Sequence, residues 1–159
     1  MATDECRVEH AKPTVARPSG TVLAFDFGEQ RTGVAVGDLS LRIAHPLTTV
    51  AAASDRERLR QVTALVQEWA PVLLIVGLPT HADGAAHPLA ARCRSFARRL
   101  QARFNIETRL IDEHLSSDQA SRSLAEAGVR GMDRKAMIDQ VAAQQILETF
   151  FSVHGDGIA

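Results

Sequence analysis

The sequence predicts one α/β domain built on a mixed sheet of five strands, in which the first three strands are antiparallel and helices flank the sheet. Two observations carry this prediction. Three strand-like segments come before the first helical segment, and helices and strands alternate afterwards. Residues 72–78 form an unbroken apolar run, which is typical of a central parallel strand. Because crossovers between parallel strands are right-handed, the later strands are expected beside the first one.

The first half of the chain supplies a hairpin, a third strand and a helix. Residues 21–28 are apolar except for Asp26 and Thr21, and residues 33–37 follow after a short turn, which predicts a β-hairpin. Residues 46–50 predict a weak third strand. Residues 54–57 read Ser-Asp-Arg-Glu, a capping box that opens a helix with an apolar stripe. Pro71 ends that helix.

The second half continues the alternation. In order, we expect the strand at 72–78, a loop at 79–88, a helix at 89–104, a strand at 106–112, a short helix from Ser116 or Ser117 to Gly128, a loop at 130–134 and a helix from 136 to about 151. Residues 1–20 are mixed and polar, and we expect a disordered arm there. The folded domain is then residues 21–151, and residues 152–159 are expected to be a flexible tail.

Composition limits the classes of function. The formal net charge is −1, from 18 basic and 19 acidic side chains, so any nucleic-acid contact must come from a local basic patch. The two cysteines, Cys6 and Cys93, belong to no metal-binding or disulfide pattern. No signal peptide or segment of transmembrane length is apparent. A reducing cytoplasm is the expected location.

Three acids interrupt apolar patterns. Asp26 lies in a predicted buried strand, and Glu113 ends the apolar stretch at 110–113. Asp139 lies at the centre of a helical stripe formed by Ala142, Ala143, Ile146 and Phe150. A buried carboxylate requires a partner or a metal. Together the three acids predict one site for a hard divalent metal at the carboxyl ends of the strands.

Local explanations remain open for each acid. Asp26 could bind backbone N–H groups at the strand end, Glu113 could be an ordinary exposed acid, and Asp139 could pair only with Lys135, four residues earlier.

The motifs resemble those of the YqgF/RuvX family. They are AFDFG at 24–28 with RTGVAVG at 31–37, IVGLP at 75–79 with DG at 83–84, DEHLSS at 112–117 with Ala120, and Lys135 and Asp139 with AA at 142–143 and ILE at 146–148. The resemblance spans residues 21 to about 151. It implies a ribonuclease-H-like fold and a nuclease that matures the 5′ end of 16S ribosomal RNA, a family formerly regarded as Holliday junction resolvases. His114 and Ser117 depart from the Arg and Thr that are frequent in the family.

The resemblance makes Asp26, Glu113 and Asp139 the catalytic acids. These would hold Mg²⁺ or Mn²⁺, with two ions completed by substrate phosphate. Asp26, on the most rigid strand, is expected to bridge the two ions. Lys135 shares a helical face with Asp139 and could contact the scissile phosphate.

Two groups of basic residues are candidates for binding the substrate backbone. Five arginines and no acid lie in residues 88–104, and Arg92, Arg99 and Arg103 share one sector of that helix. Arg130, Arg134 and Lys135 form a second group. A solvated helix face is the alternative for the first group. With 4% aromatic residues and no tyrosine, base stacking is not expected, which favours structured precursor rRNA over single strands.

Other functions stay open. A Holliday junction resolvase would use the same chemistry on branched DNA and should be a symmetric dimer; both monomer and homodimer remain possible. Ribosomal particles are possible partners, and no membrane partner is expected. A catalytically inactive nucleic-acid-binding scaffold is a further alternative, against which the three acids weigh. An actin-like ATPase would need a second related domain.

Overall fold

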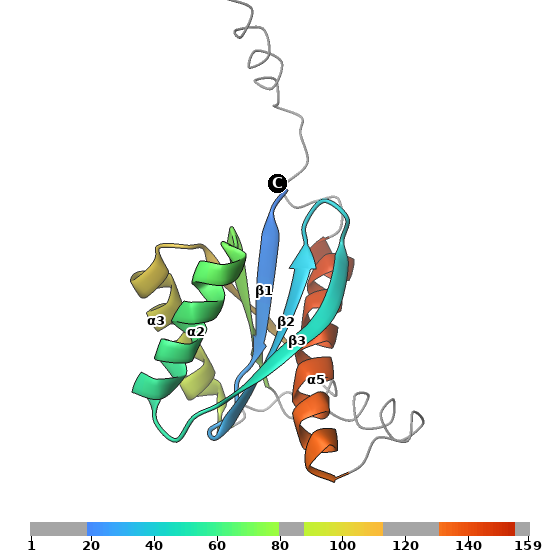
Figure 1. The fold of residues 1–159 in the computed structure, drawn as a ribbon. Helices are drawn as coiled ribbons and strands as arrows, with labels where there is room; N and C mark the ends of the chain where they lie inside the picture. The colour runs from blue at the N-terminus through green and yellow to red at the C-terminus, as the bar shows by residue number, and fades with distance from the viewer. Residues whose placement is uncertain (1–18, 80–87, 113–130, 155–159) are drawn as a thin grey trace, which may run out of the picture.

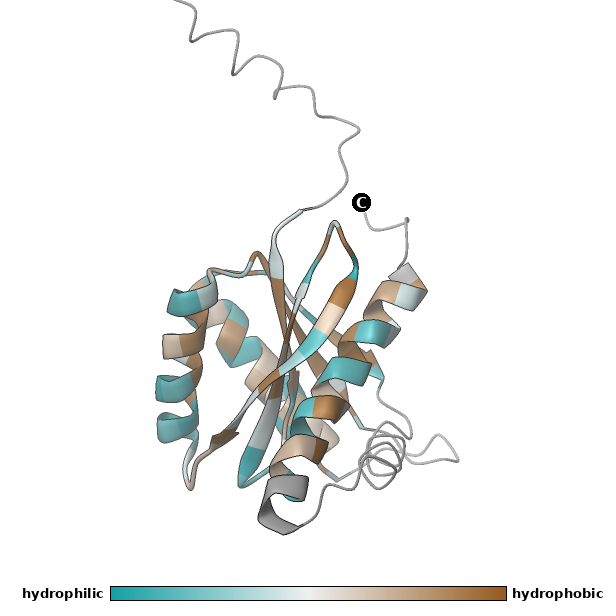
Figure 2. Cartoon of the chain, turned by 45° about the vertical axis from the view of Figure 1, so that its right-hand side comes forward, coloured by the Kyte–Doolittle hydropathy of each residue, from teal (hydrophilic) through white to brown (hydrophobic). Residues whose placement is uncertain are grey.

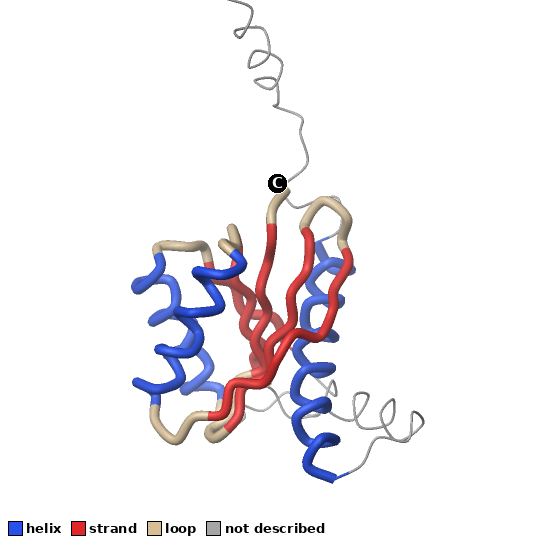
Figure 3. Tube along the Cα trace, in the orientation of Figure 1, coloured by secondary structure: helices blue, strands red, loops and turns tan. Residues whose placement is uncertain are grey.

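The computed structural model of the chain describes residues 19–79, 88–112 and 131–154, except for the side chains of residues 131–134 and 154. It contains a five-stranded sheet in the order β3-β2-β1-β4-β5. Helices α2 and α3 cover one face of the sheet and α5 covers the other (Figure 1). The tube in Figure 3 shows this arrangement of helix, sheet and helix in three layers.

The antiparallel half of the sheet begins with β1 (Thr21–Asp26), which pairs with β2 (Arg31–Asp38) in the predicted hairpin. The strand β3 (Ile43–Ala51) pairs antiparallel with β2 and is longer than predicted. The β2–β3 turn is held by Asp38, whose carboxylate accepts hydrogen bonds from the backbone N–H groups of Ser40 and Leu41. The hydrogen bond from Leu41 is the largest cause of the lowered pKa of Asp38.

The parallel half follows from two crossovers. Helix α2 (Asp55–Trp69) begins at the predicted capping box, where the Ser54 hydroxyl accepts from the Glu57 N–H. It leads to β4 (Leu73–Leu78), which pairs parallel with β1. Helix α3 (Ala90–Phe104) then leads to β5 (Thr108–Asp112), which pairs parallel with β4. The carboxyl ends of β1, β4 and β5 therefore lie at one edge of the sheet.

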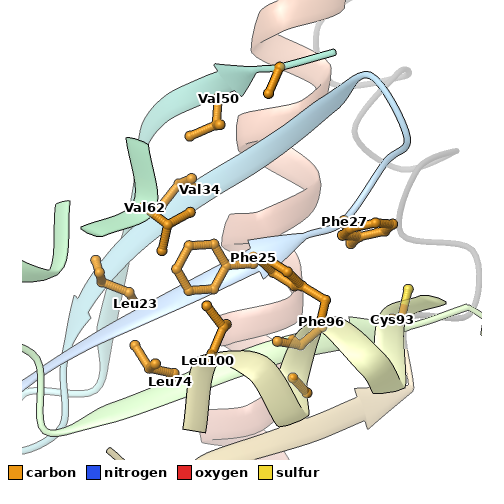
Figure 4. Packing of buried hydrophobic residues seen from close by; sticks show 13 residues of the cluster. Leu23, Phe25, Phe27, Val34, Val50, Val62, Leu74, Cys93, Phe96 and Leu100 are labelled. Atoms are coloured by element: carbon orange, nitrogen blue, oxygen red, sulfur yellow. The ribbon is translucent and has the colours of Figure 1, made fainter. Parts of the chain in front are cut away.

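Alternation along the strands divides the core in two. Leu23 and Phe25 of β1 point toward α2 and α3, where Phe25 meets the Phe96 ring edge-on at a centroid distance of 5.8 Å (Figure 4). Val22 and Ala24 point to the opposite face and pack against α5. Figure 2 shows the central strands as largely hydrophobic, while hydrophilic bands alternate with hydrophobic ones along α2 and α5.

Helix α5 (Gly131–His154) corrects both predicted limits of the last helix. Residues 131–134 were predicted to be a loop, but they are helical, and no residue between Gly131 and Gly155 breaks a helix. The helix also runs three residues past 151, because Phe150 and Phe151 are buried against the sheet and hold its last turns in place. The predicted short helix at 116–128 and most of the loop at 79–88 lie outside the described residues.

The predicted architecture is confirmed: a five-stranded mixed sheet whose first three strands are antiparallel, flanked by helices. On α3, Cys93, Phe96, Ala97 and Leu100 are buried, and Leu89 and Phe104 pack against the same core. None of the helices in the described part of the chain is both long enough and apolar enough to span a membrane.

Candidate active site

Asp26 is the last residue of β1 and lies at the carboxyl edge of the sheet. Side chains alternate along a strand, so Asp26 shares the α5 face with Ala24, which packs in the core against that helix. The residue is half-buried. The carboxylate of Asp26 thus lies at the end of β1 where the strand is no longer fully buried.

Gly33 allows helix α5 to approach the strand end that carries Asp26. It is the register partner of Asp26 in the β1–β2 hairpin. A Cβ atom placed on Gly33 would lie 1.9 Å from the backbone carbonyl oxygen of Asp139 and 2.9 Å from the Asp139 Cβ. Any side chain at position 33 would therefore collide with the helix. The absence of a side chain there sets Asp139 directly over the residue that is paired with Asp26, although the two acids are 113 positions apart in the sequence.

Hydrogen bonds from β3 fix the same turn of α5. The Thr49 hydroxyl donates to the carbonyl of Ala136 at 2.9 Å and accepts from the Gln140 side-chain amide at 3.2 Å. Thr49 is the register partner of Gly33 on the other side of β2. These bonds hold the helix three residues before and one residue after Asp139, so the position of its carboxylate is well determined.

Arg31 is the ion-pair partner of Asp139. Its Nε lies 2.6 Å from the Asp139 Oδ2, and the side chains are 41% and 17% exposed. Lys135, which had been considered as the partner of Asp139, is exposed and makes no ion pair with any described residue. Arg31 was not among the predicted site residues, although its spacing of two from Gly33 places it on the α5 face of β2.

Glu113, the third predicted acid, lies outside the described residues, immediately after the end of β5 at Asp112. Within the described part of the chain, no three metal-binding side chains come together. Asp26 and Asp139 nevertheless fit a hard divalent ion. Both offer carboxylate oxygens, and both lie on the α5 side of the sheet, with Asp139 over the register partner of Asp26.

The predicted arginines of α3 lie on the other face of the sheet, and each has an intramolecular partner. Arg92 approaches Glu29 at 3.0 Å and Asp55 at 3.5 Å, and Arg99 approaches the second oxygen of Asp55 at 3.3 Å. Arg103 donates to the Thr63 hydroxyl at 3.2 Å. The arginines thus tie α3 to the N-terminal and middle turns of α2.

A buried arginine of α2, which sequence reasoning also missed, holds the turn that follows Asp26. Arg58 is 1% exposed and donates to the carbonyls of Gly28 and Glu29 at 3.0 and 2.5 Å. It also donates to the buried Thr32 hydroxyl at 3.1 Å and pairs with Asp55. Its guanidinium stacks over the Phe27 ring, 4.7 Å from the centroid. The apolar stripe of α2 contains no signal for this contact, because Arg58 appears as one of several helical arginines.

A pocket of about 230 Å³ opens between α2 and α3 beside this arginine. Its charged lining residues are Asp55, Arg58, Arg92 and Arg99.

Two other arginines of α3, Arg94 and Arg98, are exposed on a separate groove that reaches β5 and make no ion pair with any residue that the structure describes. Arg130 and the side chain of Arg134 lie outside the described residues.

A family model described as RuvX, Holliday junction resolvase, matches residues 20–153. The chain belongs to the RuvX family. A relative from Nitrosospira multiformis is 52% identical over 144 residues, covering 91% of this chain and 95% of its own. A relative from Nitrosomonas europaea is 50% identical and covers 85% and 91%. One from Neisseria meningitidis is 52% identical and covers 84% and 89%. Each is named as a candidate pre-16S rRNA nuclease.

Solved structures resemble this RuvX-family chain more distantly. The Thermus thermophilus RuvC structure has a TM-score of 0.47 at 15% identity, covering 86% of this chain and 97% of its own. The Holliday junction resolvase of fowlpox virus has a TM-score of 0.48 at 12% identity and covers 82% and 97%.

Proposed function

We propose that this protein is a metal-dependent endonuclease that hydrolyses phosphodiester bonds in nucleic acid, and that its substrate is precursor 16S rRNA during maturation of the 5′ end. Family membership supports a nuclease, and the names of relatives that are about half identical support the RNA substrate. The observation that carries the chemistry is the meeting of Asp26 and Asp139 across Gly33 at the carboxyl edge of the sheet.

The order of the strands supports a site with Asp26 at its centre. Asp139 lies over Gly33 of β2, on one side of β1. On the other side, β4 and β5 follow, and Ile111 of β5 packs on the α5 face like Asp26. Glu113 is two residues after Ile111 in the sequence, which is the spacing of side chains on one face of a strand. Gly77, the register partner of Ile111, places no side chain between β1 and β5.

In this proposal Asp26, Glu113 and Asp139 would hold two Mg²⁺ or Mn²⁺ ions, with Asp26 shared between them. Such ions, when bound, supply a hydroxide-like nucleophile and stabilise the leaving oxygen. The residues of the chain orient these ligands: Thr49 and Gly33 fix the helix that carries Asp139, and Arg58 holds the turn after Asp26. Lys135, exposed one turn before Asp139, is available to contact the scissile phosphate.

The substrate backbone would be bound by arginines. Arg92 contacts Glu29 of the turn that follows β1, so the α3 row begins near the carboxyl edge and continues through Arg99 to Arg103. Their pairing with Asp55 and Glu29 implies that phosphates must compete with these carboxylates. Arg130 and Arg134 are proposed to extend the surface on the side of α5. We further propose that the protein acts in the cytoplasm, where ribosomal particles carry this RNA.

The test combines three substrates with purified full-length protein. Precursor 16S rRNA, a four-way DNA junction and ATP are each incubated with Mg²⁺, with Mn²⁺ or with EDTA. We expect metal-dependent cleavage of the RNA near its 5′ end. The second candidate function is a Holliday junction resolvase, which is the activity that the description of the family model names. Preferential and symmetric cutting of the DNA junction would establish it instead. Binding without cleavage under every condition would support the inactive scaffold, and hydrolysis of ATP alone would contradict all three.

A further inference from the structure

Arg31 and a divalent ion require the same carboxylate. The Arg31 Nε lies 2.6 Å from the Asp139 Oδ2, in a charge-assisted hydrogen bond to an oxygen that a Mg²⁺ ion would approach to about 2.1 Å. A guanidinium carries one positive charge and a divalent ion two, so the two repel each other when both lie at one carboxylate. The ion pair therefore opposes metal binding at Asp139.

The two side chains differ in how freely they can move. The carboxylate of Asp139 is 17% exposed, and its helix is held by the Thr49 hydrogen bonds and the close approach of Gly33. Arg31 is 41% exposed at the first position of β2, and the structure gives its guanidinium no hydrogen bond besides that to Asp139 among the described residues. The arginine, and not the acid, is the partner that can leave.

We propose that Arg31 is an internal counterion that neutralises Asp139 in the metal-free protein and withdraws when a divalent ion binds. Arg31 thus acts only through Asp139, and its charge lowers the affinity of the site for a divalent ion. This inference rests on the proposed metal site and adds to it a residue that competes with the metal.

The experiment measures Mn²⁺ binding to the full-length protein without nucleic acid, by calorimetry and by the electron paramagnetic resonance signal of free Mn²⁺. Arg31→Gln removes the charge, and Arg31→Lys keeps it. We expect Arg31→Gln to bind Mn²⁺ about 5- to 20-fold more tightly than the wild type, from loss of one positive charge near the ion. Arg31→Lys should stay within about threefold, because the charge and its distance are similar.

Arg60→Gln is the matched control. Arg60 also forms an ion pair, with Glu57, but on α2 at the other face of the sheet. Its removal changes the net charge equally, but Arg60 is 71% exposed, so solvent and salt screen its charge, and the Arg31–Asp139 ion pair is retained. The Mn²⁺ affinity of this variant should equal that of the wild type within about twofold. Circular dichroism verifies that each variant is folded.

The outcomes separate this inference from the proposed function. If Asp139→Asn abolishes Mn²⁺ binding while Arg31→Gln leaves it unchanged or weakens it, the metal site stands and the role of Arg31 is overturned. If Arg60→Gln tightens binding as much as Arg31→Gln, the effect is one of net charge and the inference also fails. If wild type and all variants bind no Mn²⁺ even in the presence of precursor rRNA, both the metal site and the competition are rejected.

Discussion

Gly33 and Asp139 are in such close contact that a single methyl group could not be placed between them: a Cβ atom on Gly33 would lie 1.9 Å from the Asp139 carbonyl oxygen. Gly33 is also the register partner of Asp26. One glycine thus determines how closely the helix that carries the second acid approaches the strand that carries the first. The distance between the two carboxylates depends on a residue that contributes no chemistry itself.

Gly33→Ala should displace α5 and damage the site. Overpacking of a tight contact costs about 1–3 kcal/mol, and the displaced groups are those at Asp139. We expect a lower melting temperature and a Mn²⁺ affinity reduced by about tenfold or more, since ligand geometry is lost.

Gly37→Ala is the matched control on the same strand, because its Cβ would meet Ile43 and the Leu147 side chain, two turns farther along α5. It should also destabilise the fold but leave Mn²⁺ affinity near that of the wild type. Equal loss of metal binding in both variants would contradict the local role of Gly33.

Asp26→Asn should abolish cleavage while leaving the fold intact. The side-chain shape is retained, but the ligand loses its negative charge, and an amide is a poor substitute for a carboxylate that is expected to contact two ions. Cleavage of precursor rRNA under single-turnover conditions is the measurement, and circular dichroism with a thermal melt reports the fold. The melting temperature without metal should be equal to or above that of the wild type, because like charges at the site are reduced. Wild-type activity in this variant would make Asp26 a structural residue and remove the site assignment.

Divalent metal should stabilise the protein against heat. Ions that bind only the native state raise the melting temperature by mass action. Mg²⁺ and Mn²⁺ are therefore expected to increase it, and Glu113→Gln and Asp139→Asn should each reduce the increase. Glu107→Gln is the control. Glu107 directly precedes β5 and pairs with Arg109, and this variant should show the same increase in melting temperature as the wild type. Calorimetry that detects no metal even with substrate present would exclude the two-metal proposal. A missing response of the free protein alone would not, since phosphate oxygens often complete the ligands of Mg²⁺.

The α3 arginines should contribute to the salt dependence of RNA binding. Arg92, Arg99 and Arg103 are changed together to Gln, which keeps helix propensity and most of the contacts of the side-chain stems. If each contacts one phosphate, the slope of log affinity against log salt should flatten by about 2 to 3 units, at about 0.7 to 0.9 per contact. Cleavage at saturating RNA should change little, because these residues position the backbone and do not hold the metals.

Arg94 and Arg98 provide the comparison for that experiment. They are on the same helix, are exposed, and have no ion-pair partner within the described ranges, in contrast to Arg92 and Arg99, which pair with Asp55. The double change to Gln should leave the slope unchanged if the substrate follows the α2–α3 side. A flattened slope in the double variant alone would move the binding surface to the groove beside β5, and an unchanged slope in both would direct attention to Arg130, Arg134 and Lys135.

The strands and helices of this fold could be predicted because their signals are local. The unbroken apolar run at 72–78 predicts a buried strand, and it forms β4. The capping box at Ser54 predicts the start of α2, and the helix begins there. The first and last residues of strands and helices were less predictable where tertiary contacts lengthen the element. The pairing with β2 lengthens β3, and burial of Phe150 and Phe151 extends α5 beyond the predicted end.

The candidate site was predictable in its acids and not in its cations. A carboxylate within an apolar pattern is conspicuous, and Asp26 and Asp139 do share one face and one edge of the sheet. Arg31 and Arg58 gave no comparable signal, since an arginine at the start of a strand or on a helix is ordinary on a protein surface. Whether a guanidinium lies in solvent or bridges distant segments depends on what folds over it.

The sequence by itself therefore determined the order of the elements, the layers of the fold and which acids leave the apolar pattern, because periodicity and turn chemistry act over a few neighbouring residues. Tertiary structure alone decided that Gly33 admits α5, that Arg31 neutralises Asp139 and that Arg58 holds the turn after Asp26. These contacts join residues separated by 29 to 108 positions. Their geometry arises only when the sheet brings the separate segments together, and no local pattern records it.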